Sequence, residues 1–152
     1  MAIYMKYGSI NGGVQLADFK NWIQLTSFQW GTGRAIGSPK NLPDVTKREY
    51  SEPSLSEITV TKPTDVASPD LFTESVAGPL KNDVTIVFTK TGAGGQEKFL
   101  TYTLKNAGLS GYSVSAGVEG DPMETLSLNY TYIEKKYYDK GNAFDLATMK
   151  KG

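Results

Sequence analysis

Short stretches in which apolar and polar residues alternate one by one are the feature of this sequence that most restricts its fold. Successive side chains of a β-strand point to opposite faces, so this alternation predicts strands that bury one face. Sixteen glycines and seven prolines supply turns between such strands. The apolar members of the clearest segments are Ile3, Met5 and Tyr7; Val84, Ile86 and Phe88; Leu100, Tyr102 and Leu104; and Leu126, Leu128, Tyr130 and Tyr132.

The segment 22–30 follows the same pattern with one irregularity. Ile23 and Leu25 share one face, the phase then slips by one residue, and Phe28 and Trp30 take over. A slip of this kind is typical of a β-bulge. We therefore expect Phe28 and Trp30 in the core and Gln29 on the opposite face.

One short helix is predicted over about residues 68–78. Ser68 is suited to cap it, Pro69 to occupy its first turn and Gly78 to end it. Its apolar stripe is formed by Leu71, Phe72, Ser75 and Val76. The chain is thus predicted to be mainly β: a compact β-barrel or sandwich with one flanking helix, in a single domain over residues 1–152.

Two segments lack a clear period. Residues 31–53 are expected to form a long loop, and loops of this length inside a small domain are usually functional or disordered. The tail from Tyr138 onward has a weak helical or coil character.

The composition leaves little room for catalysis. The chain contains neither cysteine nor histidine, which excludes thiol nucleophiles, imidazole bases and Cys/His metal sites. Asp121, Glu124 and Glu134 are candidate catalytic carboxylates by abundance only, and Gly108–Gly111 lacks the context of a nucleophile elbow. We expect no enzyme activity, no metal and no cofactor.

The charges balance, with sixteen basic and sixteen acidic residues. A nucleic-acid-binding protein usually carries a basic surplus on one face, so we expect no nucleic-acid partner. The sequence has no signal-peptide pattern and no apolar run long enough to span a membrane. We expect a protein that is made in the cytoplasm and that leaves it, if at all, without a cleaved signal.

The polar residues of the alternating segments are mostly Thr, Ser and Asn. Freely solvated strand faces usually carry Lys and Glu as well. An uncharged face suits contact with another polar surface or the wall of a wet channel, but it also agrees with the ordinary β-propensity of Thr. Composition leaves both interpretations open.

Four segments, in this order along the chain, resemble the Hcp family of type VI secretion tube proteins. The first ends in an aromatic-x-Trp-Gly pattern at Phe28–Gly31, and the most specific is the Thr-Lys to Ser-Pro-x-Leu segment within 58–72. The other two are a Leu-Lys segment within 102–114 and a Glu-x-Leu-x-Leu-Asn-Tyr strand within 124–133. The chain departs from the family in a 31–53 loop that is not glycine-rich and in a short tail, from which we expect no fused effector domain.

The resemblance implies a subunit of hexameric rings that stack into a hollow tube. It further implies secretion of the protein itself, sheath and spike proteins as partners, and effectors carried in the lumen. By this analogy the lumen wall carries Gln29, with Gln24 and Thr59 as weaker candidates. The 31–53 loop is expected to join stacked rings through its charged residues Arg34, Lys47, Arg48 and Glu49.

Two alternatives remain open. A tube protein of a related contractile particle, such as a phage tail or an extracellular injection system, fits the same patterns. A monomeric ligand-binding β-barrel is a different class, and it predicts a pocket among Trp22, Trp30 and the tyrosines.

Overall fold

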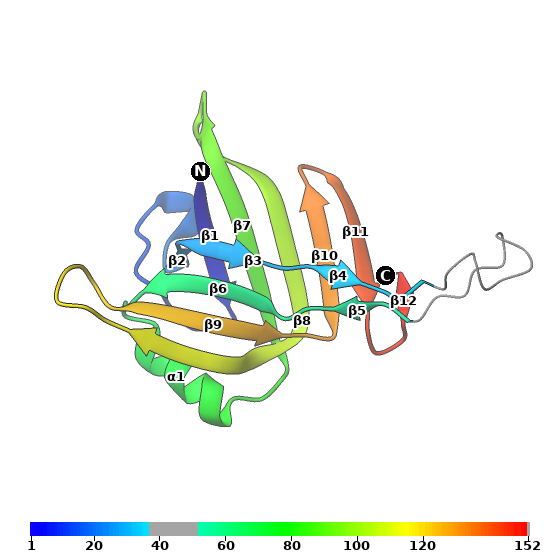
Figure 1. Ribbon diagram of the computed structural model, residues 1–152. Coiled ribbons are helices and arrows are strands. Elements are labelled where there is room, and N and C mark those ends of the chain that lie inside the picture. The colour runs from blue at the N-terminus through cyan, green and yellow to red at the C-terminus, as the bar shows by residue number, and fades with distance from the viewer. Residues whose placement is uncertain (37–51, 152) are drawn as a thin grey trace, which may run out of the picture.

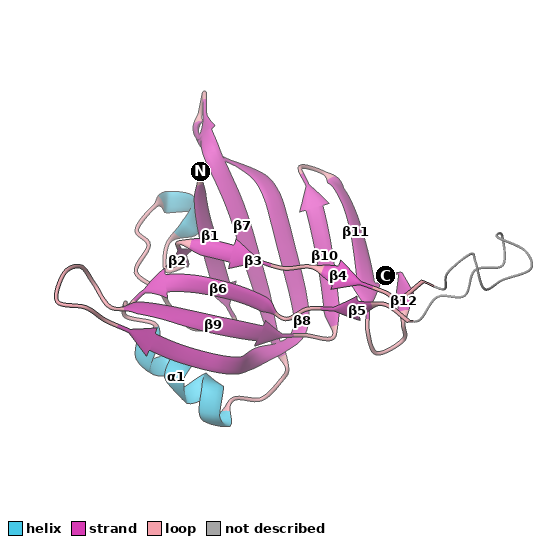
Figure 2. Cartoon of the chain, in the orientation of Figure 1, coloured by secondary structure: helices cyan, strands magenta, loops and turns pink. Residues whose placement is uncertain are grey.

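Two β-sheets packed face to face form the body of the protein (Figures 1 and 2). The computed structural model describes residues 1–36 and 52–151. Strands of the two sheets cross at a steep angle in Figure 1, an arrangement typical of orthogonal sandwiches.

Sheet A is antiparallel and contains seven strands. From edge to edge these are β12 (Lys150–Lys151), β11 (Lys140–Asp145), β10 (Tyr132–Tyr137), β8 (Gly95–Ser115), β7 (Asn82–Gly92), β1 (Ala2–Tyr7) and β2 (Ile23–Leu25). Sheet B uses the C-terminal half of β8 again, followed by β9 (Met123–Asn129), β6 (Ile58–Pro63) and β3 (Ser27–Gln29).

Three smaller elements complete the described chain. The helix α1 (Ser68–Ala77) packs against β8, and a short 3-10 helix, η1 (Ala17–Phe19), lies in the loop between β1 and β2. β4 (Thr32–Gly33) pairs with β5 (Ser54–Leu55) as a separate two-stranded ribbon.

The main core lies between the two sheets. The predicted apolar positions of β1, β7 and the first half of β8 meet those of β6 and β9 there, and Phe28 and Trp30 pack against the cluster as expected. A second, smaller cluster covers part of the outer face of sheet A. Its buried members are Tyr4, Val14, Phe19 and Val87, with Trp22 packed against them.

The prediction of a mainly β fold with one helix is confirmed, in its sandwich form. The paired strands form an open path that ends on β2 in one sheet and on β3 in the other. Thr26 separates these two strands, at the position where the phase of the pattern slips. The predicted irregularity is therefore the corner at which the chain leaves sheet A and enters sheet B.

The helix spans the expected residues, but two expectations about it were wrong. Ala67 is the N-cap residue, because the Ser68 hydroxyl is engaged in buried hydrogen bonds instead of capping. Only Leu71 of the predicted apolar stripe is buried, whereas Phe72 is 55% exposed and Val76 is 70% exposed.

Three segments are more regular than the sequence indicated. The tail contains β11 and β12 instead of coil or helix, because β11 pairs with β10 along its whole length. Residues 95–115 form one strand, although the Asn-Ala-Gly sequence at 106–108 looks like a break. Gly108 lies within this strand and packs closely under the side chain of Leu80. The predicted 31–53 loop contains β4 near its start and is followed directly by β5, with which β4 pairs.

Candidate functional site

The outer face of sheet B is the most unusual surface of the described chain. Burial alternates along β6 and β9, so every second residue points away from the core. None of the outward positions carries a charge. These positions are Ser27, Gln29, Thr59, Thr61, Pro63, Gly111, Ser113, Ser115, Met123, Thr125, Ser127 and Asn129.

The strand register sorts these side chains into rows across the sheet. Gln29 lies opposite Thr59, which lies opposite Ser127 and then Gly111. The next row runs through Ser27, Thr61, Thr125 and Ser113 in the same order. These two rows of the face therefore carry hydroxyl and amide groups at every position except Gly111, and four strands contribute to them.

Hydrogen bonds at two margins hold this face in place. At the corner of the sheets, the hydroxyls of Thr26 and Ser27 lie 2.7 and 2.5 Å from the Thr61 hydroxyl. At the opposite end, the carboxylate of Glu57 accepts hydrogen bonds from the hydroxyl of Ser110 and the amide of Asn129. Sequence patterns did not identify Thr61 or Ser113, although their alternation with buried neighbours was a usable signal.

The inner side of the same sheet holds a buried ion pair. The Lys62 ammonium is fully buried and lies 2.9 Å from both Glu124 Oε1 and Asp65 Oδ1. It also donates to the Ser68 hydroxyl and to the Pro63 carbonyl. These contacts tie β6 and β9 to the start of α1.

Glu124 is the acceptor at the centre of this cluster. Tyr112 Oη donates to its Oε2 atom over 2.7 Å, and Thr64 Oγ1 donates to the same atom over 3.1 Å. Burial raises the pKa of Glu124, but the hydrogen bonds, from Lys62 first, outweigh it and hold the pKa below its ordinary value. Burial and the hydrogen bond to Glu124 raise the pKa of Tyr112 to about 12.

Glu124, one of the three carboxylates considered for catalysis, is thus committed to an ion pair. Asp121 lies exposed in the turn between β8 and β9, and Glu134 lies on the outer face of sheet A, so the three do not share a site. Among the described residues, no three or more side chains of metal-binding type are clustered. In the same part of the chain, no helix has the length and hydrophobicity needed to cross a bilayer.

The structure brings two of the three predicted lumen residues together. Gln29 and Thr59 are cross-strand neighbours on the outer face of sheet B, and both border a shallow depression there. Gln24 lies instead in sheet A, opposite Tyr4, because the corner at Thr26 separates β2 from β3. Of the predicted stacking residues, Arg34 lies exposed just after β4, while Lys47, Arg48 and Glu49 lie outside the described residues.

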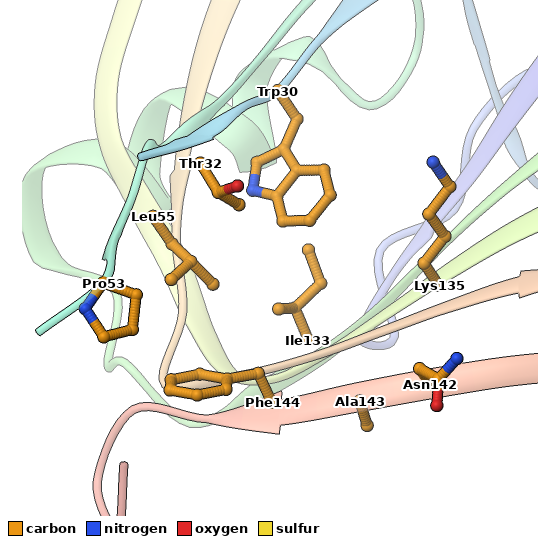
Figure 3. A pocket seen from close by; sticks show the side chains of 9 residues that line it. All are labelled: Trp30, Thr32, Pro53, Leu55, Ile133, Lys135, Asn142, Ala143 and Phe144. Carbon is orange, nitrogen blue, oxygen red and sulfur yellow. The ribbon is translucent and has the colours of Figure 1, made fainter. Parts of the chain in front are cut away.

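Trp22 and Trp30 do not share a pocket. Trp22 packs on the outer face of sheet A, whereas Trp30 packs against Tyr102 and donates a 2.7 Å hydrogen bond to Tyr130. Beside Trp30 is an apolar groove of about 360 Å³ between the β4–β5 ribbon and sheet A (Figure 3). The ligand-binding alternative predicted a pocket among Trp22, Trp30 and the tyrosines. This prediction was wrong, because the groove beside Trp30 contains neither Trp22 nor a tyrosine in its lining.

A family comparison identifies what kind of protein carries this sheet. The model described as "Type VI secretion system effector, Hcp" matches residues 4–137, which is most of the chain. The chain belongs to the Hcp family of type VI secretion tube proteins. A sequence search of curated proteins gives no match.

Solved structures of Hcp proteins share the fold. A type six secretion system protein is 23% identical with a TM-score of 0.86, and the alignment covers 99% of each chain. Hcp1 from Salmonella typhimurium is 21% identical with a TM-score of 0.77 over 99% of this chain and 98% of that one. The secreted protein Hcp3 from Pseudomonas aeruginosa is 17% identical with a TM-score of 0.69 over 95% and 97%.

Proposed function

We propose that this Hcp protein assembles into hexameric rings that stack into a hollow tube, with the outer face of sheet B turned toward the lumen. The observation that carries the proposal is the absence of charge from all twelve outward positions of that face. Such a surface binds water through hydroxyl and amide groups, yet it attracts no passing protein through fixed charge. It suits a channel wall along which a folded cargo moves.

The two outermost strands of sheet B offer a means of assembly. β3 pairs with β6 alone, and the C-terminal half of β8 pairs with β9 alone, among the described strands. Unpaired strand edges present backbone groups to a partner, and two different edges in contact give a heterologous interface. Heterologous interfaces form a closed ring when the rotation from each copy to the next, repeated around the ring, returns to the first copy.

Family membership supports a proposal for the wider role. We propose that the tube is driven by a sheath, tipped by spike proteins and itself secreted without a cleaved signal, with effectors carried in its lumen. The protein then acts by assembly and not by catalysis. Gln29 and Thr59 are the residues that we assign to the lumen wall, and Arg34, Lys47, Arg48 and Glu49 are the charges that we assign to ring stacking.

The proposal is tested by the size and shape of the purified protein. Light scattering combined with negative-stain microscopy is expected to give rings of uniform diameter with a central channel. A homogeneous monomer at high concentration contradicts the proposal. In the ring, Gln29→Trp is expected to narrow the channel and leave the outer diameter unchanged, because the side chain projects from the face of the sheet, whereas the proposed contact of β3 with a neighbouring copy uses its backbone edge. Loss of the ring would instead place Gln29 at a subunit interface.

A further inference from the structure

We infer that successive rings are joined by the β8–β9 turn of one copy, which inserts the Val118 side chain into the apolar groove beside Trp30 of a copy in the next ring. This inference rests on the proposed function, since it needs stacked rings. It does not involve the four charged residues of the 31–53 segment on which the stacking prediction was based, although Thr32 and Pro53 at the two ends of that segment line the groove.

The groove is an apolar surface that the described residues of one chain leave open. Its walls are the side chains of Trp30, Leu55, Ile133 and Phe144, which converge around the hollow in Figure 3. At about 360 Å³ it is large enough to take a branched aliphatic side chain. Burying an apolar hollow of this kind away from water is favourable. In a stacked tube, the molecule that lies next to the groove is a second copy of the chain.

The turn has the matching properties. It connects β8 to β9 across residues 116–122, and Val118 at its tip is fully exposed. An aliphatic side chain held entirely in water at the end of a hairpin gains by burial in a partner. Glu119 and Asp121 follow it in the turn, so the tip is acidic.

Charges at the rim of the groove have the opposite sign. Lys135 lines the groove and is exposed. Lys151 on β12 is the cross-strand partner of Phe144 and is also exposed. The ammonium of Lys135 at the groove and that of Lys151, opposite the groove residue Phe144, are thus opposite in charge to the two carboxylates that follow Val118. This complementarity fixes the orientation of the contact more than its strength.

The two features lie at opposite ends of sheet B. The register pairs Pro63 with Met123 at the end next to the turn, and Ile58 with Leu128 at the end next to the groove. A contact between opposite ends of identical copies is heterologous and does not close on itself, so it propagates along an axis. Each contact is small, but six copies in a ring act together and their combined strength greatly exceeds that of one.

A disulfide experiment tests this contact directly, because the chain contains no cysteine of its own. In the double variant Val118→Cys/Asn142→Cys, the second site is an exposed residue that lines the groove. Mild oxidation of concentrated rings is expected to give a ladder of linked chains that extends beyond six on a non-reducing gel. Val118→Cys/Lys20→Cys is the matched control, since Lys20 is exposed but distant from the groove; it is expected to give no ladder.

The outcomes separate the two proposals. A ladder that ends at six places the contact within one ring and overturns the inference, as does the absence of a ladder from samples in which rings are seen. A chain that forms no rings contradicts the proposed function itself.

A charge exchange gives an independent readout. Glu119→Lys/Asp121→Lys in the double-cysteine background is expected to lower the ladder yield roughly twofold to fivefold for each reversed pair. Adding Lys135→Glu/Lys151→Glu is expected to restore it. Unchanged yield in the first variant, or no restoration in the second, contradicts the assignment of these partners.

Discussion

The outer faces of the two sheets differ in the kinds of side chain that they expose. Sheet A carries Lys6, Lys105, Glu134 and Lys136 on its outer face and covers another part of it with the cluster around Phe19. Sheet B carries no charge at the twelve outward strand positions of its outer face, and the carboxylate of Glu57 lies at the margin, where it accepts hydrogen bonds from Ser110 and Asn129. Charged groups keep a surface in contact with bulk water, whereas hydroxyl groups accept confined water or a neighbour at a smaller desolvation penalty.

The charges of sheet B lie on its inner side instead. Lys62 and Glu124 both point into the protein and satisfy each other there. The sheet therefore reverses the usual distribution, with ions inside and neutral groups outside. The comparison teaches that the outer face is kept neutral although ionisable residues occur on the same strands.

Removing the buried cation is the strongest test of this reversal. Lys62→Met is expected to lower the free energy of unfolding by about 3–5 kcal/mol, because it leaves the Glu124 carboxylate buried without its partner. For a domain of this size, the melting temperature falls by roughly 6–20 °C. Thermal unfolding measures the change. The double variant Lys62→Met/Glu124→Leu is the control and is expected to recover most of the loss; if it does not, packing and not the ion pair holds this region.

The pH dependence of stability sharpens the same point. Since the pKa of Glu124 is below its ordinary value in the folded state, its carboxylate stabilises the fold above pH 4.5 and this contribution disappears as the pH falls through the folded pKa. Glu124→Gln is expected to cost about 2 kcal/mol at pH 7. Urea unfolding at several pH values is expected to show the difference from the unaltered protein shrinking toward pH 3. A difference independent of pH contradicts an ionised Glu124.

The Tyr130 hydroxyl joins two segments of the chain at the end of sheet B next to the groove. Tyr130 Oη accepts a 2.7 Å hydrogen bond from Trp30 Nε1 and donates one of 2.7 Å to the Ser56 carbonyl. Tyr130→Phe removes both and is expected to lower the free energy of unfolding by about 1–2 kcal/mol. Tyr132→Phe is the matched control, because no described residue accepts a hydrogen bond from its hydroxyl. Its free energy of unfolding, measured with urea, is expected to change by about 0.5 kcal/mol or less.

Chemical labelling compares the two outer faces with the smallest perturbation. Gln29→Cys on sheet B and Lys136→Cys on sheet A both place a thiol at an exposed position. In assembled rings, a bulky polymer-linked maleimide is expected to label Gln29→Cys severalfold more slowly than Lys136→Cys. A small maleimide is expected to label both at similar rates. Equal rates with the bulky reagent would mean that sheet B faces the outside of the ring.

Local patterns predicted much of this fold because they act within one strand at a time. The alternation around Ile3, Ile86 and Leu126 identified their strands and their buried faces correctly. The slip after Leu25 was recognised as well, together with the outward direction of Gln29. These features depend on side-chain periodicity, which the sequence displays directly.

Features that depend on distant partners could not be predicted in this way. Lys62 meets Glu124 across a separation of 62 residues, and nothing in either segment indicates the pairing. The tail forms a strand because β11 pairs with the edge of β10. Gln24 lies in sheet A and not beside Gln29, because the chain passes from one sheet to the other at Thr26. Tertiary context decided each of these outcomes, overriding weak local preference.

The continuity of β8 has a mechanical consequence. Its first half is bonded to β7 and β10 in one sheet and its second half to β9 in the other, without a break in the strand. Force applied at the end of sheet B therefore passes along a covalent chain into sheet A. There it loads many ladder hydrogen bonds in shear at the same time, instead of peeling them apart in sequence. We expect a subunit built in this way to respond to an axial load as one body.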